Sequence, residues 1–174
     1  LHLILDRWIS SVQQEVMASS GLGVTDPGLA PLVEKRISAV IGALNEMVHG
    51  FDFARLLTLY YKAHCAGDDE TKAKVLKWFR GEYATKTEAR QELGVNIVIM
   101  DDDWYEYLKL FACFLKQAGY AGMLILIDEL VNIYKIPNAI TRQYNYEKIL
   151  TMYNDAMQGK AQYLGFILCG TPQC

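Results

Sequence analysis

The 174-residue sequence lacks the features that mark several classes of protein. No stretch reaches the roughly 18 apolar residues of a membrane-spanning helix, and no signal segment opens the chain, so we expect no membrane contact. The four cysteines form no CxxC pair and have no histidine cluster beside them, which argues against a zinc site and fits a reduced, cytoplasmic protein. The net charge of −3 leaves DNA open as a partner but gives it no support.

The composition that remains is that of an ordinary globular protein. Hydrophobic residues make up 52% and charged residues 21%, and the chain is long enough to bury a core. It begins at Leu1 without a methionine, already within an amphipathic pattern, and stops soon after an apolar stretch. We therefore expect it to be a piece of a longer protein.

The most informative stretch is an aliphatic run followed by two acids. Leu124–Ile127 are large and aliphatic, Gly122 precedes them closely, and Asp128 and Glu129 follow. This order predicts a strand buried on both faces of a parallel sheet, with the acids at its C-terminal end, where open α/β sheets bind ligands. It also matches the Walker B pattern of P-loop ATPases, whose aspartate holds Mg²⁺ and whose glutamate activates the attacking water. The alternative is a core strand that ends in two solvated acids at a turn.

A second apolar stretch predicts a partner for that strand. Residues 163–169 are strand-like, and the apolar residues of 139–158 recur at helical spacing. Strand, helix and strand form a βαβ unit with parallel strands, which would bring Thr171 to the sheet edge that carries Asp128. AAA+ ATPases keep the polar sensor-1 residue at this place. Alternatively, Thr171 is a plain strand-to-turn residue before Pro172.

Apolar spacing and capping signals predict helices before the central strand. They are expected over about Leu1–Ala18, Asp26–Gly50, Asp52–Gly67, Asp68–Gly81, Thr85–Gly94 and Asp103–Gly119. Thr85 with Glu88, and Asp103 with Glu106, have the spacing of a capping box, which we favour over a metal site for the acidic run that ends at Asp103. Residues 95–100 are apolar and predict either a strand or an extended lead-in.

Several motifs together resemble the ATP-binding proteins of bacterial BREX phage-defence loci. The resemblance covers most of the chain and is strongest from Asp101 onward. The matching segments are Asp101–Lys109, Ile127–Glu129, Asn132, Tyr134–Ile136, Arg142–Gln143, Asn145–Leu150, Tyr153–Asp155 and Gly170–Pro172. The family is similar to AAA+ and origin-recognition-like P-loop ATPases.

The resemblance implies roles for individual residues. Asp128 is implied as the acid on the magnesium side, Glu129 as the catalytic base and Thr171 as the sensor. Arg142 also belongs to the pattern. It either acts on a neighbouring subunit's phosphate or pairs with an acid of its own helix, Glu147 or Asp155, and we favour the salt bridge.

One departure from the family pattern limits what this chain can do. The sequence contains no GxxxxGK[ST] phosphate loop, and Gly21-x-Gly23 lacks the lysine and hydroxyl residue that such a loop needs. We expect the full-length protein to bind ATP and Mg²⁺. The fragment by itself is expected to bind no cofactor tightly and not to hydrolyse ATP.

The fold expected is a helix-rich α/β fold in two parts. Residues 1–94 form the helical part of an ATPase domain, and residues 95–174 form a partial P-loop, AAA+-like core with the Walker B and sensor-1 strands. The function expected is that of a fragment of an ATP-hydrolysing phage-defence protein, with other defence proteins or a self-oligomer as partners. Two other interpretations compete with this one: a non-enzymatic scaffold that retains the ATPase fold, and a helical signalling adaptor.

Overall fold

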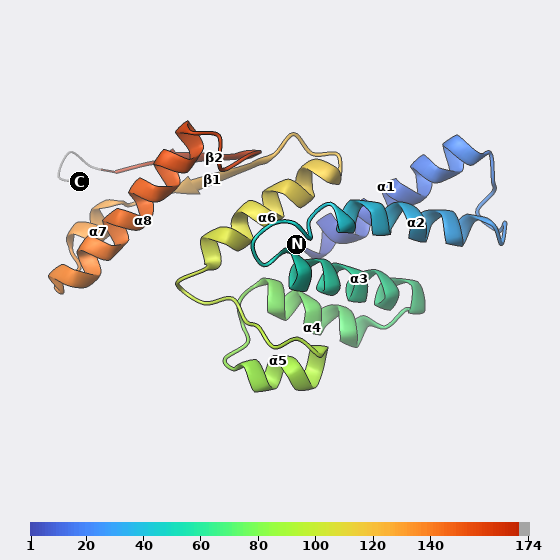
Figure 1. Ribbon diagram of the computed structural model, residues 1–174, viewed down its shortest axis with the longest axis horizontal. Helices are drawn as coiled ribbons and strands as arrows, with labels where there is room; N and C mark the ends of the chain where they lie inside the picture. Colours follow the sequence, from blue (N-terminus) through green and yellow to red (C-terminus); the bar gives the residue numbers. More distant parts are fainter. Residues whose placement is uncertain (171–174) are drawn as a thin grey trace.

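A computed structural model, described for residues 1–170, contains eight helices and a two-stranded parallel sheet in that part of the chain (Figure 1). The elements are α1 (His2–Ser20), α2 (Leu29–Gly42), α3 (Gly50–Ala66), α4 (Asp69–Phe79), α5 (Lys86–Leu93), α6 (Trp104–Gln117), β1 (Met123–Ile127), α7 (Val131–Tyr134), α8 (Ala139–Met157) and β2 (Leu164–Leu168). The expected helix-rich α/β class is confirmed. No helix in residues 1–170 combines the length and apolar character needed to cross a membrane.

Helices α1 to α5 and one side of α6 enclose the larger hydrophobic core. Its largest fully buried side chains include Trp8, Phe53, Tyr60 and Trp78, each at most 2% exposed. The indole of Trp8 meets the ring of Phe114 edge to face, with the ring centres 4.9 Å apart. Burial of each such side chain contributes roughly 1.5–3 kcal/mol, so this core is the main source of stability in the helical half.

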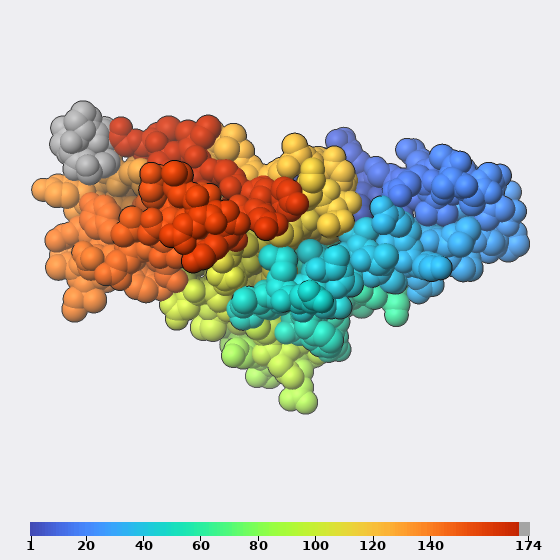
Figure 2. All heavy atoms as spheres, turned by 45° about the horizontal axis from the view of Figure 1, so that its top comes forward, coloured from blue at the N-terminus to red at the C-terminus, as the bar shows by residue number. Residues whose placement is uncertain are grey.

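Helix α6 belongs to two cores at once. Tyr107, Leu110 and Phe114 are buried in the core of the helical half. Tyr105 and Ala112 are buried in a second, smaller core beneath the sheet. In the space-filling view α1 and α2 (blue) lie at one end of the molecule and α8 (orange) at the other (Figure 2). The helix between them therefore joins the two halves by packing.

The two strands pair in parallel, as the sequence predicts, and the register runs from Met123 opposite Leu164 to Ile127 opposite Leu168. The face that carries Met123, Ile125 and Ile127 packs on the smaller core, to which α6 and α8 also contribute side chains. The other face is open, because Leu124 is 57% exposed and Leu126 is 68% exposed. The prediction of burial on both faces is therefore wrong, since the helices of the described chain cover a single face of the sheet.

Residues 95–100 form no strand in the structure and run as an extended lead-in to α6. Val95 and Val98 are buried in the core of the helical half. The indole N–H of Trp78 donates to the carbonyl of Ile97 at 2.8 Å. Of the two alternatives for this segment the lead-in is the correct one, because its apolar residues find their partners in helices rather than in a sheet.

The two expected capping boxes differ in outcome. The Thr85–Glu88 box forms in part: Thr85 Oγ1 accepts from the backbone N–H of Glu88 at 3.2 Å at the start of α5, but the carboxylate of Glu88 pairs with Lys77 rather than with the N–H of Thr85. The Asp103–Glu106 box does not form. The carboxylate of Asp103 accepts from the N–H of Met100 at 2.8 Å, and that of Glu106 pairs with Lys109 at 2.6 Å. A lysine one turn away attracts the glutamate more strongly than a backbone N–H does.

The boundary between α2 and α3 also differs from the prediction. Helix α2 begins at Leu29, after Asp26 has accepted a turn hydrogen bond from the N–H of Gly28 at 2.8 Å, and it ends at Gly42. Gly50 does not close α2 but opens α3. A Cβ atom there would lie 1.9 Å from the carbonyl oxygen of Leu44, so the close approach of two backbones requires glycine.

A polar cluster around Asp6 ties α1 to α3 and α4. Its Oδ1 accepts from the hydroxyl of Tyr60 at 2.7 Å and lies 3.2 Å from His64 Nδ1. Its Oδ2 lies 2.9 Å from His2 Nε2 and 3.5 Å from the largely buried Lys72 Nζ. Burial raises the pKa of Asp6, but the hydrogen bond from Tyr60 and the attraction of the neighbouring basic side chains outweigh it and hold the pKa below its usual value.

Replacing Asp6 with asparagine should weaken this tie. Hydrogen bonds to a charged group contribute about 1.5–3 kcal/mol, so we expect the Asp6→Asn change to lower the free energy of unfolding at neutral pH by that order. Because the folded pKa is lowered, the contribution is present above about pH 4 and is lost as the pH falls through the folded value. Urea unfolding followed by tryptophan fluorescence measures both; an equal loss at neutral and strongly acidic pH would contradict the assignment.

Candidate functional site

The two predicted site acids lie at the C-terminal end of β1, beside the end of β2 (Figure 1). Backbone pairing continues beyond the strands, since the N–H of Cys169 donates to Ile127 at 2.8 Å and the N–H of Leu130 donates to Cys169 at 3.1 Å. Asp128 and Glu129 lie between these two hydrogen bonds and are both exposed. They therefore project from a fixed edge of the sheet into solvent.

The third predicted site residue, Thr171, lies outside the described residues. Strand β2 ends at Leu168, and the backbone of Cys169 is hydrogen-bonded to Ile127 at the end of β1 and to Leu130 in the following loop. The role of Thr171 as a sensor stays a prediction.

Asp128 offers one free oxygen to a ligand. Its Oδ1 accepts from the N–H of Glu129 at 2.7 Å, and no group of residues 1–170 donates to its Oδ2. The described chain holds no group of three or more histidine, cysteine or acidic side chains suited to a metal. Magnesium is commonly bound by one or two carboxylates together with water and substrate phosphates. A single free carboxylate oxygen fits a metal that arrives with a nucleotide.

Glu129 is held in an uncommon backbone conformation. Its φ of 55° lies in the left-handed region, which costs a residue with a Cβ atom roughly 1–2 kcal/mol. Its Oε2 accepts from the side-chain amide of Asn132 at 2.8 Å, and that amide's Oδ1 accepts from Lys135 at 3.3 Å. Neither Asn132 nor Lys135 was among the predicted site residues. The repeated spacing of three residues was the signal that could have found them.

Arg142 does not form the predicted salt bridge with Glu147 or Asp155. Its Nη1 donates to the carbonyl of Ile136 at 2.7 Å. Glu147 accepts from Gln143 at 3.0 Å, and Asp155 lies 3.5 Å from a lysine of α6. Arg142 lies in the first turn of α8, so its side chain reaches back over the preceding loop rather than along the helix.

The acidic run before α6 anchors α8. Asp102 Oδ1 accepts from the hydroxyl of Tyr144 at 2.6 Å, and its backbone carbonyl accepts from Lys148 Nζ at 3.0 Å. Both partners lie on α8, the helix that connects the two strands. The run therefore helps to fix the helix that lies between β1 and β2 in the chain.

One known protein family matches the chain. The family model of the BREX system ATP-binding protein BrxC/D matches residues 1–174. The chain belongs to this family. Searches of the curated proteins and of the solved structures give no match. The resemblance drawn from the motifs is thereby confirmed, and with it membership of a multi-protein phage-defence system.

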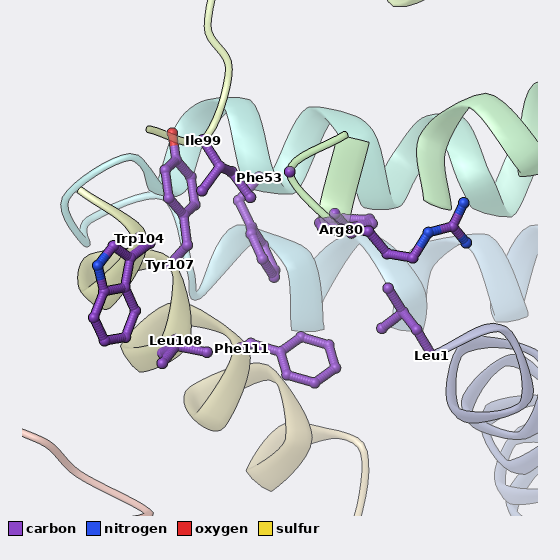
Figure 3. A pocket seen from close by; sticks show the side chains of 10 residues that line it. Leu1, Phe53, Arg80, Ile99, Trp104, Tyr107, Leu108 and Phe111 are labelled. Carbon is purple, nitrogen blue, oxygen red and sulfur yellow. The ribbon is translucent and has the colours of Figure 1, made fainter. Parts of the chain in front are cut away.

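A separate cavity in this BREX-family chain has a mostly apolar lining. It measures about 290 Å³ and is lined mainly by aromatic side chains of α3, α4 and α6. Figure 3 shows Phe53, Tyr107 and Phe111 around it, while the guanidinium of Arg80 points away. That guanidinium pairs with Glu82 at 2.7 Å. Neither Asp128 nor Glu129 lines this cavity, and we assign no chemistry to it.

The left-handed backbone at Glu129 predicts an unusual order of stability. Glycine adopts positive φ without strain, so Glu129→Gly should be more stable than Glu129→Ala by about 1 kcal/mol. The same pair at Glu147, which lies within α8, should show the opposite order, by about 1 kcal/mol, because glycine weakens helices. Urea unfolding of the four variants measures both differences. Greater stability of alanine at both positions would contradict the described backbone.

Proposed function

We propose that this chain supplies the Walker B and sensor-1 edge of an ATP-hydrolysing protein of the BREX system. Residues 1–94 are its helical part and residues 95–174 a partial P-loop core, while the phosphate loop lies outside these 174 residues. The observation that carries the proposal is the pair Asp128 and Glu129 at the C-terminal edge of paired parallel strands. Ligands bind at this edge in open α/β sheets, and the family is described as ATP-binding.

The proposal gives each acid a separate task. Asp128 turns its free Oδ2 toward the metal side of the site, since its Oδ1 is engaged by the backbone. Glu129 holds the water that attacks and accepts its proton, and Thr171, which follows β2 in the sequence, adds a hydroxyl donor. Bound Mg-ATP supplies a γ-phosphate whose charge the metal offsets, and the remaining catalysis is positioning.

Glu129→Gln in the intact protein should separate binding from turnover. The amide keeps the size of the side chain but cannot accept the water's proton, so kcat should fall by about 100-fold or more while ATP stays bound. The measurements are phosphate release and retention of labelled ATP.

A matched control is Glu147→Gln, which changes an exposed glutamate on α8 in the same way. It should leave both readings unchanged. Equal turnover in the Glu129→Gln variant and the parent protein would remove Glu129 from the role of base.

Asp128→Asn should change the dependence on magnesium. Loss of the carboxylate charge weakens metal binding, so the Mg²⁺ concentration for half-maximal hydrolysis should rise by about tenfold or more. Titration of activity with Mg²⁺ at fixed ATP measures the shift, and Asp101→Asn, at an exposed acid away from the strand, is the control. An unchanged Mg²⁺ requirement would show that Asp128 is not the acid on the metal side.

A second candidate function is a non-enzymatic scaffold that retains this fold. Residues 1–94 contribute most of the larger hydrophobic core and contain none of the predicted site residues, which suits a part of the chain that serves protein contacts. Its partners would be other proteins of the defence system or further copies of the same protein. ATPase assays of the intact protein, with and without DNA, distinguish the two: a scaffold shows no turnover that depends on Glu129.

A further inference from the structure

The side-chain amide of Asn132 lies between the carboxylate of Glu129 and the ammonium group of Lys135. Its Nδ2 donates to Glu129 Oε2 at 2.8 Å, and its Oδ1 accepts from Lys135 Nζ at 3.3 Å. An ammonium group has donors and no acceptor, so Lys135 selects the oxygen end of the amide. The NH₂ end is thereby turned toward Glu129, whose carboxylate can only accept.

The backbone holds Glu129 at the same time. Its N–H donates to Asp128 Oδ1 at 2.7 Å, and its carbonyl accepts from the N–H of Asn132 at 2.9 Å. The following N–H, that of Leu130, is bonded to the end of β2. Within residues 1–170, no group donates to Glu129 Oε1. One carboxylate oxygen is therefore anchored and the other is free to accept from a ligand.

We propose that Asn132 is the positioning residue of Glu129. By anchoring Oε2 it presents Oε1 to the attacking water, and Lys135 supports it by fixing the amide's orientation. This role rests on the proposed function, in which Glu129 is the base. In this role Asn132 acts through Glu129 and not on the nucleotide itself, so its loss affects turnover and not ATP binding.

Two substitutions in the intact ATPase test the role. Asn132→Ala removes the donor, and the isosteric Asn132→Asp puts a negative acceptor against Glu129. Since a small misplacement of a reacting group is costly, kcat should fall about tenfold in the alanine variant and at least as far in the aspartate variant. The KM for ATP should stay within about twofold, as expected when an interaction made only in the transition state is removed.

A matched control and a rescue separate positioning from a merely structural role. Asn154→Asp makes the same change at an exposed asparagine of α8 and should leave kcat unchanged. Asn132→Gln retains the amide donor and should recover part of the turnover. The melting temperature of Asn132→Asp should match that of the parent protein; a structural role would lower it together with kcat.

The outcomes for this role and for the proposed function are distinguishable. If Glu129→Gln abolishes turnover while kcat of Asn132→Asp stays within about twofold of the parent value or rises, the positioning role is wrong and the proposed function stands. If Glu129→Gln leaves turnover unchanged, both are overturned. A loss of kcat in Asn132→Asp with equal stability and partial rescue by glutamine establishes the role.

Discussion

Parallel hydrogen bonding between β1 and β2 is the constraint on which the arrangement of the candidate site depends. It aligns Ile127 with Leu168, and two further backbone hydrogen bonds join Cys169 to Ile127 and to Leu130. A shift of either strand by one residue would turn its covered side chains to the open face. The apolar packing beneath the sheet therefore fixes the register, and the register fixes where Asp128 and Glu129 emerge.

The sequence was sufficient for features that depend on local pattern. The aliphatic run before Asp128, the apolar stretch 163–169 and the helix between them all appear in the structure close to their predicted bounds. The parallel pairing followed from the order of these elements. The Thr85 cap was also predictable, because it needs only a hydroxyl and a backbone N–H three residues later.

Features that depend on a distant or competing partner could not be predicted. An aliphatic run does not encode whether a second layer covers it, which is why the open face of β1 was missed. Arg142 and Glu106 each had several partners within reach, and geometry chose a backbone carbonyl for one and a lysine for the other. The spacing of three residues is a signal for the contact of Asn132 with Glu129, but the contact also depends on a left-handed backbone at Glu129 that the residue types do not require.

The shared use of α6 shows how the two halves are connected. Neighbouring residues of this one helix, such as Tyr105 and Tyr107, are buried in different cores. A helix is a stiff element, and close-packed interiors tolerate little displacement of the side chains they enclose. The larger core of α1 to α5 and the core beside the sheet are thus held in a fixed relation by α6, which contributes side chains to both, in addition to the covalent chain.

The open face of β1 has a practical consequence for handling residues 1–174 by themselves. Leu124 and Leu126 present aliphatic surface to water, and within residues 1–170 no further strand pairs with the outer edge of either β1 or β2. Such surfaces favour self-association and sheet extension between molecules. In purification, this polypeptide should therefore require low concentration or a solubilising fusion, and light scattering is a better first check of its state than a binding assay.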